Sequence, residues 1–149
     1  MDFVAIDFET TGFVSGADND PWQLGVAVVR DGEIAETHEF FFGSVLTPEA
    51  ETMMAQWDEW QPLVAGKTLV AHNIATERTI LRKAAPLTKW GPWVDTLRLA
   101  KARYPKLPSY ALGDLCEMFG QVPQIDGRTW HDALYDAVAC ARLALTLGW

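Results

Sequence analysis

Cysteine is scarce in this sequence. The 149 residues include two cysteines, Cys116 and Cys140, and their spacing is not that of zinc ligands. Two cysteines are too few for a disulfide scaffold. We therefore expect both to be reduced thiols in the core of a cytoplasmic protein.

Long hydrophobic runs are also missing. No apolar run reaches the ~18 residues that a membrane-spanning helix needs. The amino-terminus has no basic stretch before its first apolar run, which argues against a signal peptide. With 49% hydrophobic and 21% charged residues, the composition excludes a disordered chain. We expect no membrane partner, and the length predicts a single domain over residues 1–149.

Basic residues are rare in the first part of the chain. Residues 1–66 hold 13 acidic residues and one basic residue, Arg30, whereas residues 67–106 hold nine basic and two acidic residues. The net charge of −8 disfavours a polyanion partner over most of the surface. The basic block permits a phosphate-bearing partner at one place, although a solvated helix face is the simpler explanation.

The order of hydrophobic patterns predicts an α/β fold. Strands are expected at residues 4–8, 22–29, 33–42, 67–71 and 93–94. A helix is expected to start at Thr47-Pro48-Glu49, a cap followed by proline. Further helices are expected at residues 74–84, 95–104, 109–120 and 131–147. This order indicates a mixed sheet with helices on its faces.

The first candidate functional segment ends the first strand. Asp7 and Glu9 are two residues apart, so both side chains leave the same face. Two close carboxylates repel each other, and such a pair is usually retained by a cation or a shared proton. The small residues Thr10-Thr11-Gly12 follow, where backbone amides can approach a ligand. Alternatively, both acids lie in water at a frayed strand end.

The second and third segments each join a histidine to an acid. His72 and Asn73 precede a helix that carries Glu77, and alternatively Asn73 caps that helix while Glu77 is exposed. His131 lies five residues before Asp136, about 140° away around a regular helix. They converge only if His131 lies in an irregular first turn. Alternatively, this is an ordinary helix start capped by Thr129.

The three segments together are more specific than any one of them. The order D-F-E-T-T-G, H-N-x-x-x-E and H-D-A-x-x-D-A resembles the DEDDh exonucleases, the DnaQ-like family of 3′→5′ nucleases. The segments V-D-T-L-R-L-A at 94–100 and S-Y-A-L-x-x-L-C at 109–116 also resemble that family. The resemblance covers nearly the whole chain.

This resemblance implies fold and activity. The fold would be RNase H-like, with three layers and a five-stranded mixed sheet of order 3-2-1-4-5, in which strand 2 is antiparallel and helices cover both faces. The reaction would be metal-dependent hydrolysis of phosphodiester bonds from a 3′ end, releasing 5′-mononucleotides. Two Mg²⁺ ions would be the cofactors, with Mn²⁺ able to substitute, because phosphodiester hydrolysis builds negative charge that two ions can stabilise.

The resemblance also assigns roles to residues. Asp7 would bridge the two ions, Glu9 and Asp136 would complete the first, and Glu77 would orient the second. His131 would act as general base, since an unperturbed imidazole with a pKa of about 6.5 suits that role. The terminal nucleotide would be held by Thr10, Thr11, Gly12, Phe13, His72 and Asn73.

One position departs from the family pattern. The middle acid of the family is usually Asp, whereas Glu77 reaches about one methylene further. We expect activity to persist with altered geometry at the second ion. The alternative is a catalytically weakened module that binds nucleic acid or a partner, for example in a proofreading or CRISPR integration complex. A third interpretation is a phosphohydrolase of free nucleotides.

The expected partners are single-stranded DNA or RNA 3′ ends. Arg78 and Arg82 would flank the cleft and hold phosphates, with modest and salt-sensitive affinity. Trp90 and Trp93 either pack in the core or form a partner-binding patch. A homodimer, or association with a larger nucleic-acid-processing complex, is compatible with the family.

Overall fold

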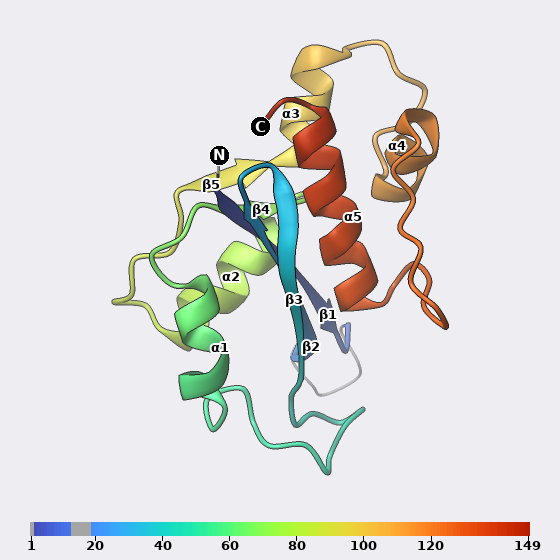
Figure 1. Cartoon of the computed structure of the whole chain (residues 1–149). Coiled ribbons are helices and arrows are strands. Elements are labelled where there is room, and N and C mark those ends of the chain that lie inside the picture. Colours follow the sequence, from blue (N-terminus) through green and yellow to red (C-terminus); the bar gives the residue numbers. More distant parts are fainter. Residues whose placement is uncertain (1, 13–18) are drawn as a thin grey trace.

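The computed structural model describes residues 2–12 and 19–149 (Figure 1). Its strands are β1 (Phe3–Thr10), β2 (Pro21–Arg30), β3 (Glu33–Phe41), β4 (Leu69–Ala71) and β5 (Trp93–Asp95). Its helices are α1 (Trp57–Val64), α2 (Ala75–Ala84), α3 (Thr96–Arg103), α4 (Leu112–Phe119) and α5 (Ala133–Thr146).

The strands form one mixed sheet in the order β3-β2-β1-β4-β5. β2 is antiparallel to both β1 and β3, whereas β1, β4 and β5 are parallel. Residues 31–32 make the turn between β2 and β3, where Asp31 and Gly32 both have positive φ, as a tight hairpin turn requires. The predicted fold class, strand order and antiparallel second strand are confirmed.

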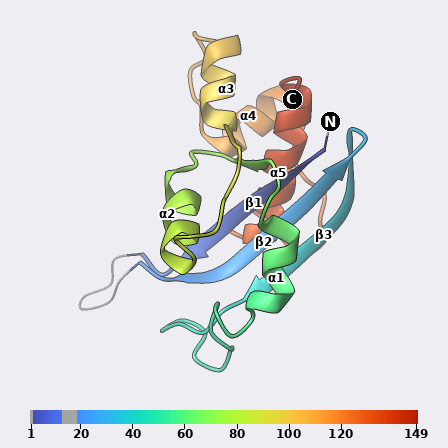
Figure 2. The same ribbon diagram turned by 90° about the vertical axis from the view of Figure 1, so that its left-hand side faces the viewer.

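Helices cover both faces of this sheet. Figure 1 shows α5 on one face and α1 with α2 on the other, and the turned view of Figure 2 has α1 in front of the sheet and α5 behind it. Alternation along β1 explains this division: Ile6 and Phe8 point to the α1 and α2 side, and Phe3 and Ala5 point to α5. α3 and α4 pack against the outer side of α5 around Leu143. Cys116 and Cys140 are free and buried, as expected.

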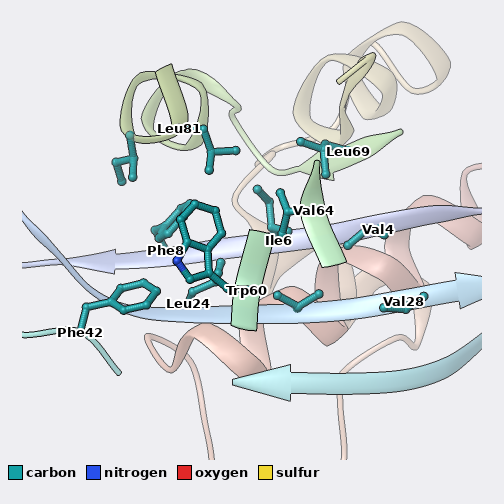
Figure 3. Close-up of a cluster of buried hydrophobic side chains, with 12 residues drawn as sticks. Val4, Ile6, Phe8, Leu24, Val28, Phe42, Trp60, Val64, Leu69 and Leu81 are labelled. Atoms are coloured by element: carbon teal, nitrogen blue, oxygen red, sulfur yellow. The ribbon is translucent and has the colours of Figure 1, made fainter. Parts of the chain in front are cut away.

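Trp60 is the largest side chain in the core beneath α1. It is fully buried, and its indole N–H donates a hydrogen bond to the carbonyl of Met53 at 2.8 Å. Figure 3 shows it between Phe8, Leu24 and Phe42. α1 is thereby attached to the sheet beside the strands that carry the candidate site.

The first helix begins later than its sequence predicts. Thr47 is not a helix cap: its hydroxyl donates to the carbonyl of Phe42, and its N–H donates to Ser44 Oγ at 3.2 Å. These bonds fold residues 43–56 into turns, and α1 begins at Trp57. The hydroxyl therefore satisfies the preceding strand end instead of a helix start.

In the described part of the chain, no helix has the length and apolar character needed to cross a membrane.

Candidate active site

The carboxyl half of β1 carries the first two acids. Asp7 and Glu9 lie on the face that packs against α5, and their carboxyls are close enough to interact electrostatically. Asp7 Oδ2 is buried with no hydrogen-bond partner. Burial raises the pKa of Asp7 well above its ordinary value, and the negative charges of Glu77, Asp136 and Glu9 raise it further.

Glu77 reaches this cluster around an open edge of the sheet. β4 is short and pairs only with Val4 and Ala5 of β1, so the edge beyond them is free. Glu77 Oε1 accepts a long hydrogen bond of 3.5 Å from the backbone N–H of Phe8 at this edge. Its other oxygen, Oε2, is buried without a partner. Burial raises the pKa of Glu77 to about 7.

Asp136 approaches from α5. Its Oδ1 atom is buried without a hydrogen-bond partner, and its carboxyl places an oxygen within 4.8 Å of a Glu9 oxygen. Burial and the charge of Glu9 raise its pKa to about 7. Carboxylates this close repel one another, and a bound cation would relieve that repulsion.

His131 lies outside the helix that its sequence predicts. α5 begins at Ala133, and Asp132 is its N-cap, accepting a hydrogen bond from the Tyr135 N–H at 3.0 Å. The alternative helix start capped by Thr129 is therefore wrong. His131 has φ +70, a left-handed conformation that histidine tolerates better than most residues.

This backbone turn brings His131 to the acids despite its angular distance in a helix. Glu9, His131 and Asp136 each place one potential ligand atom within 4.8 Å of the others. The His131 side chain is exposed, whereas both acids are half-buried. The sequence predicted that His131 and Asp136 converge only if His131 lies outside the regular helix. This is the position that His131 has.

A buried polar network holds the start of α5, and sequence analysis missed it. Gln23 on β2 is 1% exposed and accepts a hydrogen bond from the Ala133 N–H at 3.1 Å. Arg128 pairs with both Glu39 on β3 and Asp132, the residue after His131. These residues are far apart in sequence, and the only local signal was Arg128 four residues before Asp132.

Asp95 fixes the second segment. Its carboxylate caps α3 by accepting from Leu97 N–H, as expected, and it also accepts from the N–H groups of Asn73 and Ile74. Asn73 is therefore not the side-chain cap of α2 that the sequence suggests, and it has φ +63. One acid thus orders the starts of two helices beside Glu77.

The predicted substrate-binding residues differ in whether their polar side-chain atoms are already used in internal hydrogen bonds. Both ring nitrogens of His72 are used internally, by Thr96 Oγ1 at 2.8 Å and the Tyr110 carbonyl at 2.7 Å. A direct nucleotide contact from His72 stays a prediction that this geometry does not favour. The Asn73 side chain is exposed.

The turn after β1 is partly described. The Thr11 N–H donates to the carbonyl of Asp20 at 2.8 Å, and Thr11 Oγ1 accepts from the Asp20 N–H. Thr10 and Gly12 lie on either side of it, and Gly12 has φ +69. Phe13 lies outside the described residues.

The chemistry of the cluster fits hard divalent cations. Three buried oxygens without hydrogen-bond partners come from three of its acids, Asp7, Glu77 and Asp136. Unpaired buried carboxylate oxygens are costly, and an ion that accepts oxygen ligands removes that cost. The donor set contains no thiolate, which favours magnesium or manganese over softer metals.

Comparisons with known proteins find a matching family model and several similar chains. A family model described as exonuclease, RNase_T, matches residues 46–144. The PolC-type DNA polymerase III of Streptococcus thermophilus is 31% identical over 95% of this chain, and that of Halalkalibacterium halodurans is 29% identical over 95%. The chain spans 11% of the length of each of these relatives.

Solved structures share the fold. Exonuclease X in complex with 5′ overhanging duplex DNA has a TM-score of 0.72 and 22% identity, covering 98% of this chain and 93% of that one. Escherichia coli exonuclease I in complex with a dT13 oligonucleotide has a TM-score of 0.73 and 19% identity, covering 98% of this chain and 40% of that one.

Proposed function

This chain belongs to the exonuclease family, of the DEDDh, DnaQ-like type, and on that premise we propose that it is a metal-dependent 3′→5′ exonuclease. It would hydrolyse the phosphodiester bonds of single-stranded DNA or short RNA ends and release 5′-mononucleotides. The observation that carries the proposal is the convergence of four carboxyls from β1, α2 and α5, three of them with a buried unpartnered oxygen.

Asp7, Glu9, Glu77 and Asp136 would hold two Mg²⁺ ions, for which Mn²⁺ can substitute. When bound, such ions stabilise the negative charge that develops on phosphate oxygens during hydrolysis. The residues themselves contribute preorganisation, since the β1 pair is fixed in the sheet and the other two acids are fixed on helices. The long hydrogen bond from Phe8 N–H to Glu77 keeps the glutamate directed at the cluster.

His131 would be the general base that takes a proton from the attacking water. Its ring lies beside Glu9 and Asp136, and its exposure leaves it accessible to solvent and substrate. The Arg128 and Gln23 network would keep its backbone in place. The terminal nucleotide would be held by Thr10, Thr11, Gly12, Phe13 and Asn73. His72, fixed by Thr96 and Tyr110, would hold the backbone in place just before Asn73.

The decisive experiment follows a 5′-labelled oligonucleotide with Mg²⁺, with Mn²⁺ and with chelator. Stepwise shortening that needs metal and is lost in Asp7→Asn supports the proposal. Asp58→Asn on α1 is the control, because it removes an exposed carboxylate outside the cluster. Absence of shortening at high enzyme concentration, with oligonucleotide binding intact, would instead support a weakened binding module.

A second experiment addresses His131. General base catalysis typically contributes about 10²- to 10⁴-fold, so His131→Ala and His131→Asn should each lower kcat by that order. Retention of more than about a tenth of the wild-type rate by both variants would remove His131 from this role.

A non-cutting module is the second candidate, and Glu77 is the observation that favours it. The PolC-type relatives are DNA polymerases, so either function is compatible with association with a replicative polymerase. Free nucleotides are a further substrate class, and a parallel incubation with nucleoside triphosphates tests it.

A further inference from the structure

A basic cavity lies outside the carboxylate cluster, between α2 and the segment that leads into β5. Its volume is about 330 Å³, and its lining consists of Arg78, Arg82, Pro86, Thr88, Trp90 and Trp93. Arg78 and Arg82 are exposed and four residues apart on α2, so their side chains lie on the same side of the helix.

The two guanidiniums of this cavity are available for a ligand. Neither forms an ion pair with a carboxylate of residues 2–12 or 19–149. Arg30 and Arg128, by contrast, are each paired with glutamate. In a chain of net charge −8, two unpaired cations side by side attract an anion to this place.

The aromatic wall of the cavity is rigid. Trp90 donates its indole N–H to the Ala85 carbonyl at 3.1 Å, and its ring stacks on Trp60 with centroids 6.1 Å apart and an interplanar angle of 17°. Trp57 packs edge-on against it at 6.1 Å. Trp93 is half-buried at the start of β5. Flat aromatic faces beside guanidiniums suit a base joined to a phosphate.

We propose that this cavity binds an internal nucleotide of a single nucleic-acid strand whose 3′ end lies at the carboxylate cluster. The inference rests on the proposed exonuclease function. Arg78 directly follows Glu77 on α2, so the cavity and a candidate metal ligand are carried by the same short helix. Arg78 and Arg82 contact phosphates, and a base packs on the tryptophan wall. This continuity favours a nucleic-acid strand over an acidic protein segment.

Substrates of different length test the cavity independently of the carboxylate cluster. We compare KM for a dT12 oligonucleotide with KM for the p-nitrophenyl ester of thymidine 5′-monophosphate, which supplies only a terminal nucleotide. Arg78→Ala/Arg82→Ala should raise KM for dT12 on the order of 25-fold at 0.1 M salt, because each phosphate contact adds about 0.7 to the salt slope for single strands. KM for the ester should change less than about twofold.

Arg30→Ala/Lys67→Ala is the matched control. It removes two positive charges that line a different cavity, beside the start of β1. Its KM for dT12 should stay within about twofold of wild type. Trp93→Leu, which keeps an apolar side chain against the core, should raise KM for dT12 about fivefold or more through lost stacking.

Binding is also measured without turnover, by fluorescence anisotropy of 5′-labelled dT12 in chelator across a salt series. The double arginine variant should lower the salt slope by about 1.4. If wild type cleaves neither substrate while this slope change is observed, the exonuclease proposal fails and the cavity stands. An unchanged dT12 affinity and slope, equal KM changes on both substrates, or a loss confined to binding of a poly-glutamate peptide would each overturn the cavity proposal.

Discussion

Gly25 on β2 lies in backbone contact with Ala133 at the start of α5. A Cβ atom placed on Gly25 would be 2.1 Å from the Ala133 carbonyl oxygen and 2.5 Å from the Leu134 nitrogen. Gly25 is also the antiparallel partner of Asp7. The absence of a side chain at this position therefore sets how closely α5, with Asp136, approaches the acids of β1.

Gly25→Ala should displace the start of α5 and disrupt the site. Overpacking against backbone costs about 3 kcal/mol, which lowers Tm by roughly 6–12 °C in a chain of this size. Thermal unfolding by circular dichroism measures this loss, and nuclease activity should fall with it. Gly113→Ala is the control, because its Cβ would make only an ordinary 3.4 Å contact with Trp130. Equal melting temperatures for Gly25→Ala and wild type would contradict the close approach.

Metal binding should reverse a pH-dependent loss of stability. The folded-state pKa values of Glu77 and Asp136 are about 7, above the ~4 of unfolded carboxyls. Their stabilising contribution is therefore complete below about pH 4 and is lost as pH rises through 7. In chelator, Tm should be lower at pH 8 than at pH 6, and Mg²⁺ should raise it mainly at pH 8.

The same melting series on Asp7→Asn tests whether the pH dependence of Tm comes from the carboxylate cluster or from the net charge of the protein. This variant should show a smaller drop between pH 6 and pH 8 and a smaller shift with Mg²⁺, because it removes the buried carboxyl of Asp7, whose own pKa is raised in the folded state. Asp58→Asn should behave as wild type. A metal-free Tm that rises from pH 6 to pH 8 would be incompatible with the raised pKa values.

The extra methylene of Glu77 should be required for function in this chain. Its carboxylate accepts a hydrogen bond from the Phe8 N–H that is already 3.5 Å long. The shorter side chain of Glu77→Asp would move the carboxylate away and weaken this hydrogen bond further. We expect kcat with Mg²⁺ to fall about 10-fold, with a smaller loss in Mn²⁺. Glu77→Gln, which keeps the length and removes the charge, should lose more activity than Glu77→Asp. Higher activity of Glu77→Asp than of wild type would show that the family-typical acid fits this site better.

Arg128→Ala should loosen His131 through its neighbour Asp132. Loss of the pairs with Glu39 and Asp132 leaves two partly buried carboxylates uncompensated, at a cost of about 1–3 kcal/mol. kcat should fall about 10-fold while KM for the p-nitrophenyl ester stays nearly constant, because the arginine only positions the base. Arg30→Ala breaks an exposed pair with Glu36 and should change neither stability nor rate appreciably. An unchanged kcat in Arg128→Ala would show that His131 is held by other contacts.

The fold was largely predictable because its signals are local or ordered along the chain. Alternating and continuous apolar runs located β1, β2 and β3, and Asp95 was correctly identified as the cap of α3. The helix expected from Thr47 was wrong because the same threonine hydroxyl can satisfy a strand end or a helix start. Only the tertiary position of Phe42 decides between them.

The convergence of the candidate acids and His131 could be predicted from the sequence, whereas the residues that hold them in place could not. The acids and His131 come from motif spacing, whereas the left-handed turn at His131 depends on where Asp132 is held by Arg128. Gln23 and Glu39 carry no local pattern, since their partners are more than a hundred and nearly ninety positions away, respectively. The second set of bonds made by Asp95 is likewise visible only in three dimensions.

The brevity of β4 has a consequence for how the protein opens. From Asp7 to Thr10, β1 is hydrogen-bonded to a neighbouring strand on one side only, that of β2. Amide protons there should exchange with solvent sooner than those of Val4 and Ala5, which have strands on both sides. Activity would then be lost by local unfolding of this end of β1 while the hydrophobic core stays folded. Divalent ions bound to Asp7 and Glu9 would stabilise this end against opening.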